Sequence, residues 1–207
     1  MVNVLIVEDK KMPRDCMEGY IKSSERYRLA ASITNAGMAE MTCMRYDIDL
    51  ILMDVCTEEG ESGIEACAVI KRQFPDIKII IVTSMADSSF ISKAREADAD
   101  SFWYKEVSEH ELLDIMDRTV AGESVWPDKS PDVQIGNAVS CEFTQGELEV
   151  LRFLVKGLPD SAIAESLHIS VPAVRWHINQ LFEKTGYNNR VSLACDVINK
   201  DLIVPGF

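Results

Sequence analysis

Short apolar runs alternate with longer amphipathic segments over the first 121 residues, and this alternation constrains the fold more than any other feature of the chain. The runs are rich in Ile, Val, Leu and aromatic residues and nearly continuous, as in strands that are covered on both faces. They span 3–7, 29–33, 49–54, 77–84 and 100–105, and the segments between and after them carry apolar residues at helical spacing. The pattern predicts an α/β fold, a doubly wound (βα)5 domain with a five-stranded parallel sheet and right-handed crossovers, over residues 1–121.

The pattern lapses from 122 to 142, where Pro, Gly and small polar residues favour a linker with room for a short helical turn. Residues 143–207 are wholly helical in pattern. Thr144 followed by Glu147 is a capping-box signature for the first of four helices. The sequence therefore predicts a small all-α domain after the α/β domain.

Composition and charge bear on the cellular location of the protein and on the partners it can bind. The six cysteines are scattered, without C-x-x-C or zinc spacing, so we expect reduced thiols and a cytoplasmic location. No apolar stretch approaches the roughly 18–20 residues of a membrane span, and the N-terminus lacks the layout of a signal peptide, so no membrane association is expected. Residues 1–140 carry 15 basic and 26 acidic groups and residues 141–207 carry 6 and 8, so neither part is a polybasic nucleic-acid binder.

Ionisable residues stand where the predicted strands end. Glu8 and Asp9 follow the first strand, and Asp54 ends the buried run "LILMD". Thr83 and Lys105 end the last two strands. The carboxyl ends of parallel strands meet at one edge of the sheet, where ligands bind in open α/β folds. The sequence therefore predicts that these five side chains converge.

Three converging carboxylates repel one another and raise one another's pKa unless a cation is present. Mg²⁺ suits carboxylates, a backbone carbonyl and waters. With Mg²⁺ and Lys105 holding charge, Asp54 becomes a nucleophile toward phosphorus, while Thr83 and Lys105 can bind phosphoryl oxygens. A rival interpretation takes "DIDLI" (47–51) as the nucleophile motif of haloacid dehalogenase-like phosphatases. That motif must follow a hydrophobic strand and here precedes one, so the phosphatase interpretation is disfavoured.

Residues 1–121 resemble the receiver domain of two-component response regulators. The resemblance rests on the acidic pair, the phospho-accepting aspartate, the switch hydroxyl, the switch aromatic and the lysine, which are Glu8, Asp9, Asp54, Thr83, Phe102 and Lys105. It implies that Asp54 accepts a phosphoryl group from a histidine kinase with Mg²⁺ present. It implies no enzyme activity beyond self-phosphorylation from a phospho-donor and autodephosphorylation.

Two segments depart from the family pattern. After Asp54 the chain has "VCTEEGESG", with no Pro, three acids and one extra residue before Gly63; Cys56 would still offer its backbone carbonyl to the metal. The extra acids are candidates to alter metal affinity, kinase docking or phosphoryl lifetime. Lys105 is followed by Glu106 instead of Pro, so the usual cis peptide is not expected, since a non-proline cis bond costs about 2.5–4 kcal/mol.

The segment "DSAIAESLHISVPAVRWHINQLFEKTG" has the layout of a helix-turn-helix. Ser170 can cap the second helix. Helical spacing leaves Arg175, Trp176 and Asn179 outward, where groove-reading side chains stand. Residues 143–207 resemble the four-helix LuxR-type DNA-binding domain, and the order of the two domains is that of the NarL/FixJ transcriptional regulators. We expect Ser170, Lys184 and Arg190 to lie near promoter DNA as well.

The helical domain has few cations, so we expect a homodimer on two half-sites of double-stranded DNA, which doubles the phosphate contacts. The leading hypothesis is a DNA-binding response regulator controlled by phosphorylation. The alternative is a phosphorylation-independent regulator or protein-interaction module that uses the receiver for dimerisation, which the altered loop after Asp54 motivates.

Overall fold

The computed structural model describes residues 1–105 and 109–204. The chain forms two compact units, one of Met1–Ser84 with Ser88–Asp128 and one of Met85–Asp87 with Lys129–Phe207. Each unit has its own hydrophobic core.

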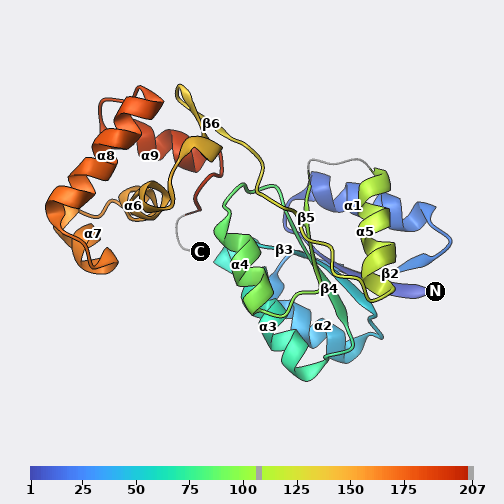
Figure 1. The fold of residues 1–207 in the computed structure, drawn as a ribbon. Coiled ribbons are helices and arrows are strands. Elements are labelled where there is room, and N and C mark those ends of the chain that lie inside the picture. The colour runs from blue at the N-terminus through green and yellow to red at the C-terminus, as the bar shows by residue number, and fades with distance from the viewer. Residues whose placement is uncertain (106–108, 205–207) are drawn as a thin grey trace. The chain divides into compact units, whose positions relative to one another are not determined.

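The first unit is a five-stranded parallel sheet in the order β2-β1-β3-β4-β5 (Figure 1). The strands are β1 (Val2–Val7), β2 (Tyr27–Ile33), β3 (Leu50–Asp54), β4 (Lys78–Thr83) and β5 (Ser101–Tyr104). The helices are α1 (Lys11–Ser23), α2 (Ala39–Arg45), α3 (Gly63–Gln73), α4 (Ser89–Glu96) and α5 (Glu109–Val120). Helices α1 and α5 cover one face and α2, α3 and α4 cover the other, so the predicted doubly wound fold is confirmed.

Burial on both faces explains the continuous apolar runs. Every residue of β3 is buried, including Asp54 at its end. Strand β2 begins at Tyr27, two residues before the predicted start, where its backbone pairs in register with Val2 of β1. The buried Tyr27 also donates a 2.5 Å hydrogen bond from its phenol to Asp117 of α5. That pairing joins residues 90 positions apart, so no local pattern announces it.

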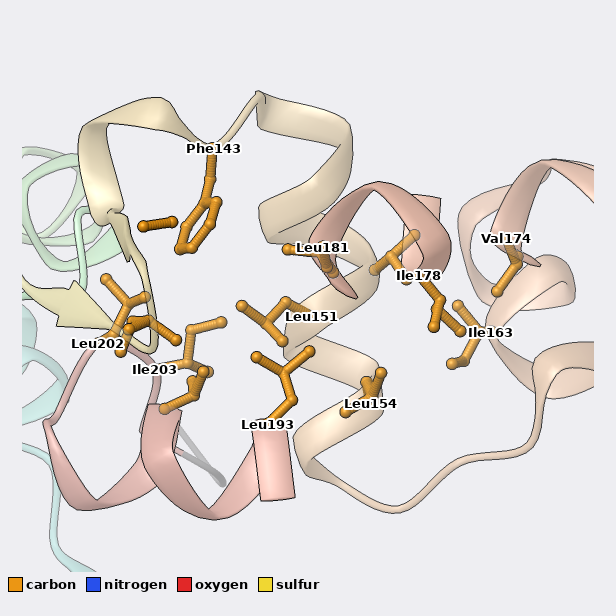
Figure 2. Packing of buried hydrophobic residues seen from close by; sticks show 14 of the residues in the cluster. Phe143, Leu151, Leu154, Ile163, Val174, Ile178, Leu181, Leu193, Leu202 and Ile203 are labelled. Atoms are coloured by element: carbon orange, nitrogen blue, oxygen red, sulfur yellow. The ribbon is translucent and has the colours of Figure 1, made fainter. Parts of the chain in front are cut away.

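The described part of the second unit contains the α-helices α6 (Gln145–Val155), α7 (Asp160–Leu167), α8 (Val171–Thr185) and α9 (Arg190–Asn199). Their apolar faces meet around Leu151, Ile163, Ile178 and Leu193 (Figure 2). The predicted caps are confirmed, since Thr144 and Glu147 form a capping box at α6 and the Ser170 hydroxyl accepts the amide of Ala173 at α8.

The segment predicted as a linker, 122–142, is divided between the two units. Residues up to Asp128 belong to the first unit. A hairpin of β6 (Gln134–Ile135) and β7 (Ala138–Val139), which the sequence pattern did not predict, belongs to the second unit and buries Ile135 in its core. A 3-10 turn at Ser140–Glu142 matches the expected helical turn.

Among the described residues, no helix is long and apolar enough to cross a membrane. None of the six cysteines, all of which lie among the described residues, forms a disulfide in the structure.

Candidate functional site

The carboxyl edge of the sheet gathers the predicted site residues. Glu8 and Asp9 follow β1 directly, Asp54 ends the neighbouring strand β3, and Thr83 ends β4. Lys105 follows β5, and its amide donates a 2.8 Å hydrogen bond to the carbonyl oxygen of Thr83. The sheet order therefore places all five residues along one edge.

Lys105 joins two of the carboxylates. Its Nζ lies 2.8 Å from Oδ1 of Asp54 and also pairs with Oε2 of Glu8. All three side chains are largely buried, with exposed side-chain fractions of 10% for Lys105, 5% for Asp54 and 0% for Glu8. The other carboxylate oxygen of Glu8, Oε1, accepts the amide of Lys10 at 3.0 Å, which holds the carboxylate in place.

Burial dominates the electrostatics of Asp54. Removal from water raises the pKa of its carboxyl to about 6, the charge of Lys105 opposes that rise, and the nearby Glu8 adds to it. Two carboxylates therefore share a single ammonium group, and the site has an excess of negative charge.

Glu8, Asp9 and Asp54 can offer one carboxylate oxygen each within 4.8 Å of one another. Oδ1 of Asp9 is buried and has no hydrogen-bond partner among the described residues, which is costly unless a cation binds there. Hard oxygen donors and excess negative charge fit Mg²⁺. The residues present therefore fit the metal that the sequence predicts.

The atypical loop after Asp54 is held by hydrogen bonds to the segment that follows β2. The Thr57 hydroxyl accepts the amide of Ala36 at 2.9 Å, and Thr34 donates to the carboxylate of Glu58 at 2.7 Å. The loop contains a 3-10 turn, Glu58–Gly60, in which Glu59 has a φ of 64°. Among the described acids, Glu58, Glu59 and Glu61 lie outside the metal-capable cluster.

The loop after Asp54 closes so that Gly63 packs directly against the Asp54 backbone. Cys56 pairs with Ser62 in an isolated antiparallel bridge, and the amide of Gly63 donates to the carbonyl oxygen of Val55 at 2.9 Å. A Cβ at position 63 would lie 1.8 Å from the carbonyl oxygen of Asp54, so only glycine fits without displacing the backbone. The Cys56 carbonyl stays a predicted metal ligand.

The two switch residues lie inside the sheet. Thr83 is fully buried at the end of β4, and Phe102 of β5 is 1% exposed. The rings of Phe102 and Tyr104 meet edge to face at a centroid distance of 5.1 Å. Glu106, and with it the expectation about the peptide bond after Lys105, lies outside the described residues.

The recognition-helix prediction concerns α8. Val174 and Ile178 are buried, while Arg175, Trp176 and Asn179 are exposed, as helical spacing predicts. Trp176 is 57% exposed, a large exposure for an indole ring. The three exposed side chains therefore lie on the face of α8 opposite its buried residues.

The predicted DNA-contacting cations carry intradomain ion pairs, which sequence reasoning missed. Asp160, the first residue of α7, accepts Arg175 Nε at 3.0 Å and Arg190 Nη2 at 2.7 Å. The sequence shows Asp160 at the start of a predicted helix. Its two arginine partners lie 15 and 30 residues away, so the sequence pattern does not reveal them. Lys184 pairs with the buried carboxylate of Glu147 at 2.7 Å, so its ammonium is directed to the start of α6.

Each of the two units matches a known protein family. Residues 4–117 match the response regulator receiver domain, and residues 142–197 match the bacterial regulatory proteins of the luxR family. The chain belongs to the response regulators, and it combines a receiver domain with a LuxR-type DNA-binding domain.

Among curated proteins, the chain is similar to the response regulator protein VraR of Staphylococcus aureus, with 27% identity over 98% of this chain and 99% of the relative. VraR of Staphylococcus epidermidis is 26% identical over the same shares. Among solved structures, two RcsB dimers bound to two parallel DNAs match with a TM-score of 0.65 at 19% identity, over 95% of this chain and 97% of theirs. RcsB of Salmonella enterica serovar Typhimurium, bound to the promoter rprA with phosphomimetic BeF3⁻, has a TM-score of 0.62 at 20% identity, over 95% and 98%.

Proposed function

We propose that Asp54 accepts a phosphoryl group from a histidine kinase and that the modified protein controls transcription through α8. The observation that carries the proposal is the convergence of Glu8, Asp9 and Asp54 with Lys105 at the sheet edge. A buried carboxylate that served packing alone would need no second and third carboxylate beside it. The arrangement suits phosphoryl transfer.

In the proposed step, a carboxylate oxygen of Asp54 forms a bond to phosphorus while the phosphorus–nitrogen bond of the kinase phosphohistidine breaks, and the imidazole leaves with that electron pair. Lys105, already 2.8 Å from Asp54 Oδ1, is placed to pair with a phosphoryl oxygen. The Thr83 hydroxyl is the proposed donor to a second one. Mg²⁺, held by Glu8, Asp9, Asp54 and the Cys56 carbonyl, would neutralise the charge that gathers on the phosphoryl oxygens.

For the second unit we propose binding to double-stranded promoter DNA in the cytoplasm. Arg175, Trp176 and Asn179 would read the major groove, and Arg190 would contact phosphate. Because Asp160 neutralises part of the charge of Arg175 and Arg190, one subunit has little net attraction for DNA. We therefore propose a homodimer on two half-sites; RcsB, which shares this fold, binds DNA as dimers.

Phosphoryl uptake tests the first unit. The protein is incubated with acetyl phosphate and Mg²⁺, and phospho-forms are separated by phosphate-affinity electrophoresis. The wild type and Asp76→Asn, which changes an exposed aspartate, should shift equally, while Asp54→Asn should not shift. A shift in Asp54→Asn equal to that of the wild type would overturn the proposal.

Selection from random duplex DNA tests the second unit, with the protein in the presence and absence of acetyl phosphate. We expect a two-fold symmetric sequence that is enriched more strongly after phosphorylation. Equal enrichment by wild type and Asp54→Asn would favour the phosphorylation-independent alternative, and no enrichment by either would point to a protein partner.

A further inference from the structure

Residues 123–126, called here the strap, run along the outer edge of β5. Strand β5 is the last in the sheet order, so its edge has backbone groups that need partners. The amide of Phe102 donates to the carbonyl oxygen of Val125 at 2.9 Å, and the amide of Val125 donates to Ser101 Oγ at 3.0 Å. The segment therefore covers the edge as a short extra strand would, although the sequence pattern predicts only a linker there.

Side chains fix the end of the strap. Trp126 stacks on Phe102 at a centroid distance of 6.2 Å and an interplanar angle of 30°. The guanidinium of Arg95, from α4, lies 4.3 Å from the centroid of Trp126. Stacked aromatic pairs and cation–π contacts each stabilise a docked conformation, by roughly 0.5–1 kcal/mol for a cation–π contact whose cation is exposed, as Arg95 is. Trp126 therefore lies between α4 and β5, directly against the residue that the family resemblance marks as the switch aromatic.

Phe102 is connected to the phosphoryl site through two adjacent strands. Tyr104 contacts the ring of Phe102 and is the register partner of Thr83 in β4. The next residue, Lys105, donates its amide to Thr83 and its ammonium group to Asp54. A displacement of Thr83 or Lys105 is therefore transmitted to Phe102 through β5. Trp126 packs on the ring of Phe102 from the outer edge of that strand.

We propose that Trp126 is a positioning residue of the switch, which holds Phe102 in the conformation seen when Lys105 is paired directly with Asp54. This inference rests on the proposed phosphorylation of Asp54. A phosphoryl group draws Lys105 and Thr83 toward itself, Phe102 follows β5, and the stack with Trp126 is lost. The strap then changes its contacts on β5, so the signal reaches the chain that leads to the DNA-binding unit through its own backbone.

Fluorine NMR of the full chain labelled with 5-fluorotryptophan tests the inference. The label gives one resonance for each of Trp103, Trp126 and Trp176, and Trp126→Phe assigns the Trp126 resonance by its disappearance. Beryllofluoride with Mg²⁺ is the probe, because it mimics a phosphoryl group and its own bound resonances appear in the same spectrum. We expect the Trp126 resonance to shift in proportion to bound beryllofluoride, and neither change to occur in Asp54→Asn.

Bound beryllofluoride with an unmoved Trp126 resonance would overturn the inference and leave the proposed function intact. Absence of any bound resonance in the wild type would overturn the proposed function, and the inference with it.

The affinity for beryllofluoride gives a second test, because it would not change if Trp126 had only a structural role. If the stack favours the unmodified conformation, removing it must favour the modified one by the same factor. Trp126→Ala should therefore lower the half-saturating beryllofluoride concentration by roughly twofold to tenfold. Trp126→Phe keeps a stacking ring and should stay near the wild-type value. Equal half-saturation for wild type and Trp126→Ala would contradict the inference.

Discussion

Gly63 lies directly against the backbone of Asp54, because a Cβ at position 63 would come within 1.8 Å of the Asp54 carbonyl oxygen. This contact ties the start of α3 to the end of β3. Gly63→Ala must displace one of the two, and overpacking of this kind costs roughly 1–3 kcal/mol. We expect that loss in urea unfolding, together with slower phosphoryl uptake because the Asp54 backbone moves.

Gly19→Ala is the matched control for Gly63→Ala. Position 19 lies inside α1, and a Cβ there would meet no atom within 4 Å. Alanine favours a helix interior over glycine by roughly 0.5–1 kcal/mol, so this variant should be slightly more stable and take up phosphoryl groups normally. Equal stability changes in the two variants would contradict the close contact.

The buried charge of Asp54 makes stability depend on pH. Its pKa is raised from 3.8 to about 6, mainly by burial, so the native state holds the proton more tightly than the unfolded chain does. Stability from this group is complete below about pH 4 and is lost as pH rises through about 6. At pH 7.5 with EDTA, Asp54→Asn should raise the free energy of unfolding by roughly 1–3 kcal/mol.

The measurement is urea unfolding of wild type and Asp54→Asn between pH 4 and pH 8. The difference in stability should grow with pH up to about 7 and then level off. A difference that does not change across this range would show that burial of the ionised Asp54 carries no such cost.

Asp160 forms ion pairs with Arg175 and Arg190, the two arginines that we propose contact DNA. Asp160→Asn removes its negative charge from between Arg175 and Arg190, so affinity for non-specific duplex should rise several-fold. The slope of log affinity against log salt should steepen by roughly one, as for one added phosphate contact. Fluorescence anisotropy at several salt concentrations measures both quantities.

Glu165→Gln controls for charge alone, because it removes an exposed acid from the same helix without releasing the arginines. If Glu165→Gln raises affinity and salt slope as much as Asp160→Asn, the ion pairs of Asp160 have no special effect on DNA binding.

Thiol reactivity tests the packing of the first unit. Burial raises the pKa of Cys43 to about 11 and that of Cys67 to about 12, whereas Cys16, Cys141 and Cys195 are exposed. Because the thiolate is the reactive form, Ellman's reagent at pH 8 should modify the three exposed cysteines quickly. Cys43 and Cys67 should react only on unfolding. Rapid modification of either, detected by peptide mapping, would contradict the core as described.

The strands and the acidic edge could be predicted because they follow from local patterns and one topological rule. Continuous apolar runs announce buried parallel strands, and parallel strands bring Asp54 and Glu8 to the same edge. The capping box of Thr144 and the cap at Ser170 involve neighbours three residues apart, so the sequence displays them directly.

What could not be predicted depends on contacts between distant residues. The stack of Trp126 on Phe102 and the pairing of Asp160 with Arg190 have no local signature. Lys184 shows the same limit, since helical spacing places its Cα but cannot reveal that its long side chain reaches Glu147 on α6.

The most direct test of the central claim identifies the residue that carries the phosphoryl group. The protein phosphorylated with acetyl phosphate and Mg²⁺ is reduced with borohydride, which converts an acyl phosphate of aspartate to homoserine, and the peptides are sequenced by mass spectrometry. We expect homoserine at position 54 and at no other aspartate. Homoserine at another position, or none in a protein that binds Mg²⁺, would contradict this expectation.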